Sequence, residues 1–168
     1  FSEGTREELG RALAMLASLL FLLVNLASAT AMAAPATDPV ITAARVGGDE
    51  TRTRFVTDLT TPTGYSVYVL PDPWRVVIDL KNVRFDLPPD AGSKVRGLIG
   101  AYRYGEVEDG RGRIVLDTLG PVLIEKSFIV EAQDGQPARI VVDIARTTEA
   151  AFRKTYKADN TPAPAPPK

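Results

Sequence analysis

The residues with the clearest capacity for chemistry are the arginines and aspartates of a motif, Arg-x-Val-x-Asp, that occurs four times. Residues i, i+2 and i+4 of an extended strand share one face, so Arg, Val and Asp of each copy would point the same way. If two such strands pair antiparallel and in register within one half of the chain, each Arg lies opposite an Asp. Exposed pairs of that kind contribute about 0.2–1 kcal/mol each. The alternative is that this polar face binds a ligand. The four copies begin at Arg54, Arg75, Arg113 and Arg139 and end at Asp58, Asp79, Asp117 and Asp143.

A glycine-rich segment, residues 97–105, holds a second candidate site, Tyr102-Arg103-Tyr104. Tyr can stack on a sugar ring and Arg can bind a carboxylate through two hydrogen bonds, so the two residue types suit a sugar–peptide ligand. Strand alternation sends the tyrosines to the face opposite Arg103, and the competing interpretation makes them core or edge residues. The candidate binding residues are therefore Tyr102, Arg103 and Tyr104, with Arg54, Arg75, Arg113 and Arg139.

The composition removes most catalytic chemistry from this chain. It contains no His and no Cys, so the common zinc ligand sets and the Ser-His-Asp and Cys-His systems cannot be assembled from its residues. The carboxylates fall one to a strand with an Arg expected beside each, which disfavours acid–base catalysis and makes a glycoside hydrolase a poor alternative. A formal net charge of −1 over 168 residues gives no general attraction to nucleic acid. We therefore predict no catalytic residue, no metal site and no cofactor here.

Alternating patterns and turn residues predict an all-β domain over residues 38–146 with an internal duplication. Its halves are about 38–83 and 92–146, and each would supply one sheet of about four strands. The two similar, symmetry-related sheets would pack face to face on their Ile, Leu, Val and Phe side chains, with Trp74 in the core. The expected strands are 40–46, 53–59, 65–70 and 74–80, then a strand within 95–105, and 112–118, 122–130 and 138–144.

The two ends of the chain differ in composition from this domain. Arg6 and Arg11 precede an uncharged run and then small residues, which predicts a cleaved export signal, a separate helix over 1–34; an uncleaved membrane anchor is the alternative. Residues 147–168 suggest one or two helical turns and then a Pro/Ala-rich linker to a further domain, with a frayed tail as the alternative.

With these features in view, the chain resembles the AMIN domain, an N-terminal module of periplasmic N-acetylmuramoyl-L-alanine amidases that also occurs in secretins of type IV pilus machines. The resemblance rests on Trp74 to Leu80, on Tyr102-Arg103-Tyr104-Gly105, and on the motifs that start at Arg113 and Arg139. It is moderately specific and covers about residues 38–146.

The resemblance implies two symmetry-related sheets, peptidoglycan as the partner and a periplasmic location, with divisome proteins as further candidate partners. It also implies that the parent is a zinc-dependent amidase that hydrolyses the bond between N-acetylmuramic acid and L-alanine, with the zinc in a separate catalytic domain. A wall-anchoring domain of a pilus secretin is the alternative. Membrane contact is expected only through the export signal. The family defines no binding residues to carry over, so the candidates above stand on the sequence alone.

Overall fold

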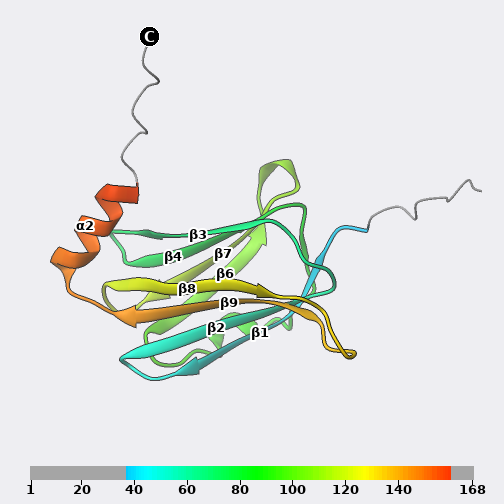
Figure 1. Ribbon diagram of the computed structural model, residues 1–168, viewed down its shortest axis with the longest axis horizontal. Helices are drawn as coiled ribbons and strands as arrows, with labels where there is room; N and C mark the ends of the chain where they lie inside the picture. Colours follow the sequence, from blue (N-terminus) through cyan, green and yellow to red (C-terminus); the bar gives the residue numbers. More distant parts are fainter. Residues whose placement is uncertain (1–36, 160–168) are drawn as a thin grey trace, which may run out of the picture. The chain divides into compact units, whose positions relative to one another are not determined.

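A β-sandwich forms the part of the chain that the computed structural model describes, residues 37–159 (Figure 1). The predicted signal at 1–34 and the Pro/Ala-rich residues from 160 onward lie outside these residues. The elements, in chain order, are β1 (Val40–Gly48), β2 (Arg52–Leu59), β3 (Tyr65–Leu70), β4 (Arg75–Leu80), β5 (Arg84–Phe85), η1 (Ala91–Ser93), β6 (Ile99–Glu106), η2 (Glu108–Gly110), β7 (Gly112–Thr118), β8 (Val122–Val130), β9 (Ala138–Arg146) and α2 (Glu149–Asp159).

The strands form two sheets, which confirms the all-β prediction. The five-stranded sheet has the order β5-β1-β2-β9-β8 and the four-stranded sheet the order β3-β4-β7-β6. All neighbours are antiparallel except the short β5, which runs parallel to β1. The two sheets enclose one hydrophobic core, in which Phe55 of β2 meets Tyr102 of β6 with ring centroids 5.4 Å apart.

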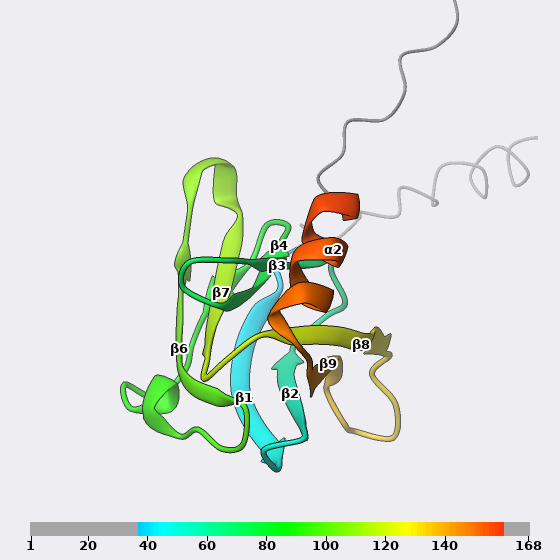
Figure 2. The ribbon, with the colours of Figure 1, turned by 90° about the vertical axis from the view of Figure 1, so that its left-hand side faces the viewer.

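The duplicated halves exchange strands, so the prediction of one sheet per half was wrong. β1 and β2 pair with each other and β8 with β9, but the central pair of the five-stranded sheet is β2 with β9. In the four-stranded sheet the central pair is β4 with β7. If β1–β4 are matched to β6–β9, the two sheets have the same strand order (Figures 1 and 2). Any Arg-x-Val-x-Asp strand complements any other antiparallel copy, so the motif alone cannot distinguish pairing within a half from pairing between halves.

Alternation along the motif strands divides core from surface as expected. The apolar residues between Arg, Val and Asp point into the sandwich, and each is at most 1% exposed; they include Phe55, Ile78, Ile114, Leu116, Ile140 and Val142. Burial of side chains of this size stabilises a fold by about 1.5–3 kcal/mol each. The Arg, Val and Asp residues of the motifs therefore lie on the outer faces of both sheets.

The helix α2 is longer than the one or two turns that the sequence suggested, and it packs on the sandwich beside the β3–β4 connection (Figures 1 and 2). Phe152 is fully buried and its ring meets Trp74 edge-on, with centroids 4.7 Å apart. Trp74 is partly buried and packs against the core, as predicted. The first part of the expected linker thus contributes a core side chain.

Close packing explains Gly97 and Gly112. Gly97 packs against Thr53 near the start of β2, and Gly112 occupies the equivalent position at the start of β7. Gly97 has φ +64°, and a Cβ there would collide with Thr53 Oγ1 and the Asp49 carbonyl oxygen. Thr53 Oγ1 in turn accepts a hydrogen bond from Leu98 N at 2.9 Å. At Gly112 a Cβ would collide with Val83 and lie 2.9 Å from Phe85 Cε2. Gly97 therefore allows the two halves to pack closely and does not open the backbone of the 97–105 segment to a ligand.

Candidate functional site

The outer face of the five-stranded sheet carries a group of charged residues that we call the first cluster, Arg45, Arg54, Asp58, Arg139 and Asp143. Arg54 lies opposite Asp143, and Asp58 lies opposite Arg139, across the β2–β9 pair. Arg54 donates from Nε to Asp143 Oδ1 at 2.6 Å and from Nη2 to Oδ2 at 2.8 Å. The predicted opposition of Arg and Asp is confirmed, but it joins the two halves of the chain.

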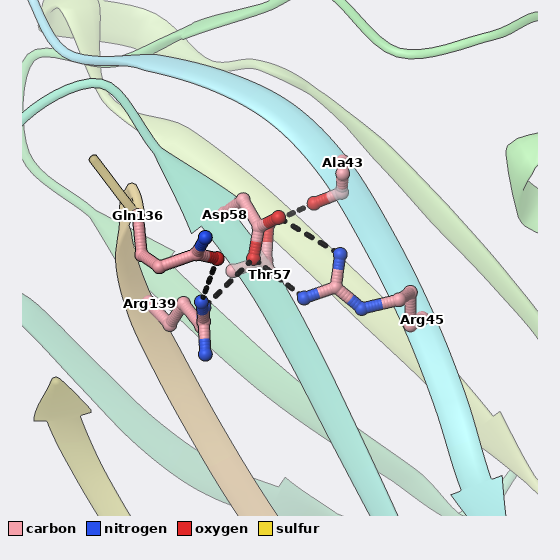
Figure 3. Close-up of polar contacts among 6 residues, drawn as sticks. All are labelled: Ala43, Arg45, Thr57, Asp58, Gln136 and Arg139. Carbon is pink, nitrogen blue, oxygen red and sulfur yellow. Dashed lines mark hydrogen bonds and ion pairs between the residues drawn. The ribbon is translucent and has the colours of Figure 1, made fainter. Parts of the chain in front are cut away.

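Asp58 sits between two arginines (Figure 3). Arg45 of β1 donates from Nη1 and Nη2 to the two carboxylate oxygens at 2.8 and 2.7 Å. Arg139 Nε lies 3.7 Å from Asp58 Oδ1, and its Nη2 donates to Gln136 Oε1 at 2.8 Å. Asp58 is only 8% exposed, so its charge depends on these partners for compensation.

The outer face of the four-stranded sheet carries the equivalent set, which we call the second cluster, Arg75, Asp79, Arg103, Arg113 and Asp117. Arg113 donates from Nε and Nη2 to the two oxygens of Asp79 at 2.6 and 3.0 Å. Arg103 Nη2 donates to Asp117 Oδ1 at 3.1 Å. Arg75 lies opposite Asp117 in register, but its Nε donates to the Pro73 carbonyl at 3.2 Å.

The carboxylates of the two central pairs are held ionised. The Arg113 guanidinium, with a further hydrogen bond from Tyr68, lowers the pKa of Asp79. The Arg54 guanidinium lowers the pKa of Asp143 in the same way. Groups fixed as anions are poor proton donors at neutral pH, so these pairs suit recognition better than acid–base catalysis. Each cluster contains three arginines and two aspartates, which leaves one positive charge in excess on each face.

The structure does not bring the three residues of the Tyr102-Arg103-Tyr104 candidate together. Tyr102 is 3% exposed and packs in the core, where burial raises the pKa of its phenol. Tyr104 packs against Phe85 with centroids 5.3 Å apart and donates its hydroxyl to the Pro88 carbonyl at 3.3 Å. Arg103 points outward with 66% of its side chain exposed. The interpretation of the tyrosines as core or edge residues therefore describes the structure, and only Arg103 of the three reaches an outer face.

Sequence reasoning missed Arg45, which occupies in the first cluster the position that Arg103 occupies in the second. A shared signal was present, because Ala43-x-Arg45-x-Gly47 and Ala101-x-Arg103-x-Gly105 have the same spacing. Both arginines come from the strand beside the first motif strand of their half, lie opposite its Val and donate hydrogen bonds to its Asp. The opening strands of the two halves, which the predicted duplication already included, therefore carry equivalent arginines.

Residues 37–159 contain neither a metal site nor a membrane-spanning helix. No group of three or more acidic side chains is arranged to hold a metal ion there. Within the same range, no helix has the length and apolar character needed to cross a membrane.

A duplicated β-sandwich with an arginine-rich cluster on each outer face is the class of domain that these observations define. Comparison with protein families identifies the family within this class, because the family model of the AMIN domain matches residues 41–134, more than half of the chain. The chain belongs to the AMIN domain family. A search of curated proteins found no significant match.

AMIN domains are peptidoglycan-binding and targeting modules, found in amidases and secretins and in periplasmic proteins. The matched range runs from β1 to β8, whereas β9 and α2 follow it. The structure assigns both to the same folded unit, since β9 pairs with β2 and Phe152 of α2 is fully buried.

Proposed function

We propose that this chain is the peptidoglycan-binding and septal-targeting module of a periplasmic N-acetylmuramoyl-L-alanine amidase. In this proposal the module performs no hydrolysis and binds no cofactor. It holds a zinc-dependent catalytic domain of the same protein against the wall, where cleavage of the amide between N-acetylmuramic acid and L-alanine serves wall turnover and daughter-cell separation. Divisome proteins are proposed as additional partners, and residues 1–34 as the export signal.

The observation that carries the proposal is the exposed excess of arginine on each outer face. The chain as a whole has a formal net charge of −1, so the positive charge of the clusters is a local feature. Peptidoglycan presents carboxylates on its peptide stems, and guanidinium groups bind carboxylates through paired hydrogen bonds. Arg54 and Arg103 keep 56% and 66% of their side chains exposed even though each is paired, so both remain accessible to a ligand.

The proposal is tested by co-sedimentation of the purified chain with insoluble peptidoglycan. We expect the unmodified chain in the pellet, and less of it there as salt is raised, because exposed charge–charge contacts are screened. Arg103→Ala should weaken sedimentation several-fold. It should lower the free energy of unfolding by no more than about 1 kcal/mol, since an exposed ion pair contributes at most that much.

Lys154→Ala is the matched control, because Lys154 is exposed on α2 and lies in neither cluster. It should sediment like the unmodified chain. Recovery of the unmodified chain entirely in the supernatant would remove wall binding from the proposal.

The parent enzyme is tested on the full-length protein. Histidine and glutamate side chains arranged as zinc ligands in another domain, with release of peptides from peptidoglycan, would support the amidase. Long amphipathic strands of a pore domain would instead assign the module to a secretin.

A further inference from the structure

A depression of about 330 Å³ lies on the outer face of the five-stranded sheet, at the end where β2, β8 and β9 meet the β1–β2 turn. Its charged lining is Arg52, Arg54, Glu125, Lys126 and Asp143. Arg52 Nη2 lies 3.1 Å from Glu125 Oε1, and Arg54 is bonded to Asp143. Both carboxylates therefore already have an arginine partner.

Lys126 supplies the one positive charge in this depression that is not matched by a carboxylate of the lining. It lies opposite Asp143 across the β8–β9 pair, and its positive charge helps to lower the pKa of Asp143. Lys126 is exposed and forms no ion pair with any residue that the structure describes. With Arg52 75% exposed beside it, the depression can receive an anionic group from solvent.

A second depression, of about 200 Å³, lies at the equivalent place on the four-stranded sheet. The strand registers establish the equivalence, because Ser66 lies opposite Asp79 as Lys126 lies opposite Asp143. Arg111 likewise stands two residues before Arg113, as Arg52 stands two residues before Arg54.

The lining of the second depression has the same excess of one positive charge as the first, but different residues supply it. Ser66 replaces Lys126, but Lys81, two residues after Asp79, supplies an ammonium group to the lining. Asp79 is already bonded to Arg113. Among residues 37–159, neither Lys81 nor Arg111 has a carboxylate within ion-pair distance. Arg111 Nε donates to the Glu108 carbonyl at 3.4 Å, so the charge of Arg111 and that of Lys81 both lack an anionic partner that a ligand could supply.

We propose that the two depressions are equivalent sites for the carboxylates of wall peptides, one on each outer face, so that one module binds two peptide stems. This inference rests on the proposed function and adds the number of sites, their place and the group that they recognise. Recurrence of a cationic depression at pseudo-equivalent positions, built from non-identical residues, is the observation that carries it. Two sites that engage one polymer raise its apparent affinity by about 10²–10⁴ over one site.

The first experiment counts the sites with a soluble probe, N-acetylmuramoyl-L-alanyl-D-glutamic acid, added to isotope-labelled protein. We expect amide shifts around both Lys81 and Lys126 and a stoichiometry of two. Lys126→Glu should remove the shifts on the five-stranded sheet and leave those on the other sheet, and Lys81→Glu should do the reverse. The same compound with both carboxylates amidated should produce neither set.

The second experiment uses insoluble peptidoglycan and the same variants. Each single reversal should weaken sedimentation about tenfold or more, because the polymer is then held at one site, and the double variant should not sediment. Lys154→Glu makes the same change of charge on α2, outside both depressions, and should sediment like the unmodified chain. Thermal unfolding of all four variants separates loss of binding from loss of folding.

The outcomes distinguish the two proposals. If the unmodified chain sediments but the reversals at Lys81 and Lys126 do not weaken it, or if the probe binds at one place or away from both depressions, the inference of paired sites is overturned and wall binding stands. Equal shifts from inorganic phosphate at the same concentration would overturn the carboxylate assignment. If the unmodified chain fails to sediment, the proposed function and this inference fall together.

Discussion

The two outer faces began as copies of one pattern, and they differ most where their edge strands contribute. Both have a central Arg–Asp pair with two hydrogen bonds, Arg54 with Asp143 and Arg113 with Asp79. On the four-stranded face, Tyr68 of β3 adds a third hydrogen bond by donating to Asp79 at 3.1 Å. The equivalent residue on the five-stranded face is Phe128 of β8, which cannot donate and remains 38% exposed.

The remaining aspartates show the opposite difference. Asp58 has Arg45 and Arg139 around it and is nearly buried, whereas Asp117 has Arg103 and keeps 35% of its side chain exposed. The central pairs, which hold the halves together, are therefore preserved, while the outer positions have diverged. This pattern indicates that the pairs serve the fold first and that the periphery of each face sets what it can bind.

The largest expected difference between the faces is in the cost of losing an aspartate. Asp58→Ala should lower the free energy of unfolding by about 2–3 kcal/mol, because Arg45 loses its hydrogen-bond acceptor and the half-buried Arg139 loses its nearest negative charge. Asp117→Ala should cost less than about 1 kcal/mol, since its partner is exposed. Urea unfolding of both variants measures the difference, and equal losses would show that the two faces are energetically alike.

An exchange at equivalent strand positions should show how far the halves have become specialised. Gly112→Thr should destabilise by about 2 kcal/mol, because the side chain would enter space occupied by Val83 and Phe85. Thr53→Gly should cost a similar amount, since Leu98 N would lose its acceptor. Thermal and urea unfolding report both changes. If Gly112→Thr left the free energy of unfolding unchanged, positions 53 and 112 would be interchangeable.

The smallest expected effect concerns Tyr68 and the response to acid. The lowered pKa of Asp79 means that its ionised form stabilises the fold above the unfolded pKa, near pH 4, and that this contribution is lost as the pH falls through the folded value. Tyr68→Phe removes a donor to the anion, so it should raise the pKa of Asp79 and move the loss to higher pH, at a cost below about 1 kcal/mol at neutral pH. Carboxyl titration by NMR measures this shift, with Asp143 as the internal reference that should not move.

The sequence predicts the strands of this domain well because local rules decide them. Period-two alternation and the turn residues located eight strands, with β3, β7 and β8 at the bounds that the structure has. Pairing is not local, and four strands that carry the same motif are equally complementary to one another. The exchange of strands between halves therefore could not be read from the motif.

The candidate site was predicted only in part, because strand alternation is local and the pairing of strands is not. The repeated arginines face outward as the spacing requires, and alternation already separated Arg103 from Tyr102 and Tyr104. The depressions around Lys126 and Lys81 depend on the pairing between halves, because β2 brings Arg52 beside β9 and the start of β7 brings Arg111 beside β4. The burial of Phe152 was missed too, although Phe152 and Tyr156 stand four residues apart on one face of α2 and their rings stack in the structure.

The exchanged strands also bear on how the chain acquires its fold. The bond between Arg54 and Asp143 spans 89 positions, so β2 must wait for almost the entire domain before it meets its partner β9. Neither half can complete a sheet by itself, and contacts so distant in sequence make folding slow. During synthesis, the five-stranded sheet therefore cannot close until the residues of β9 have left the ribosome.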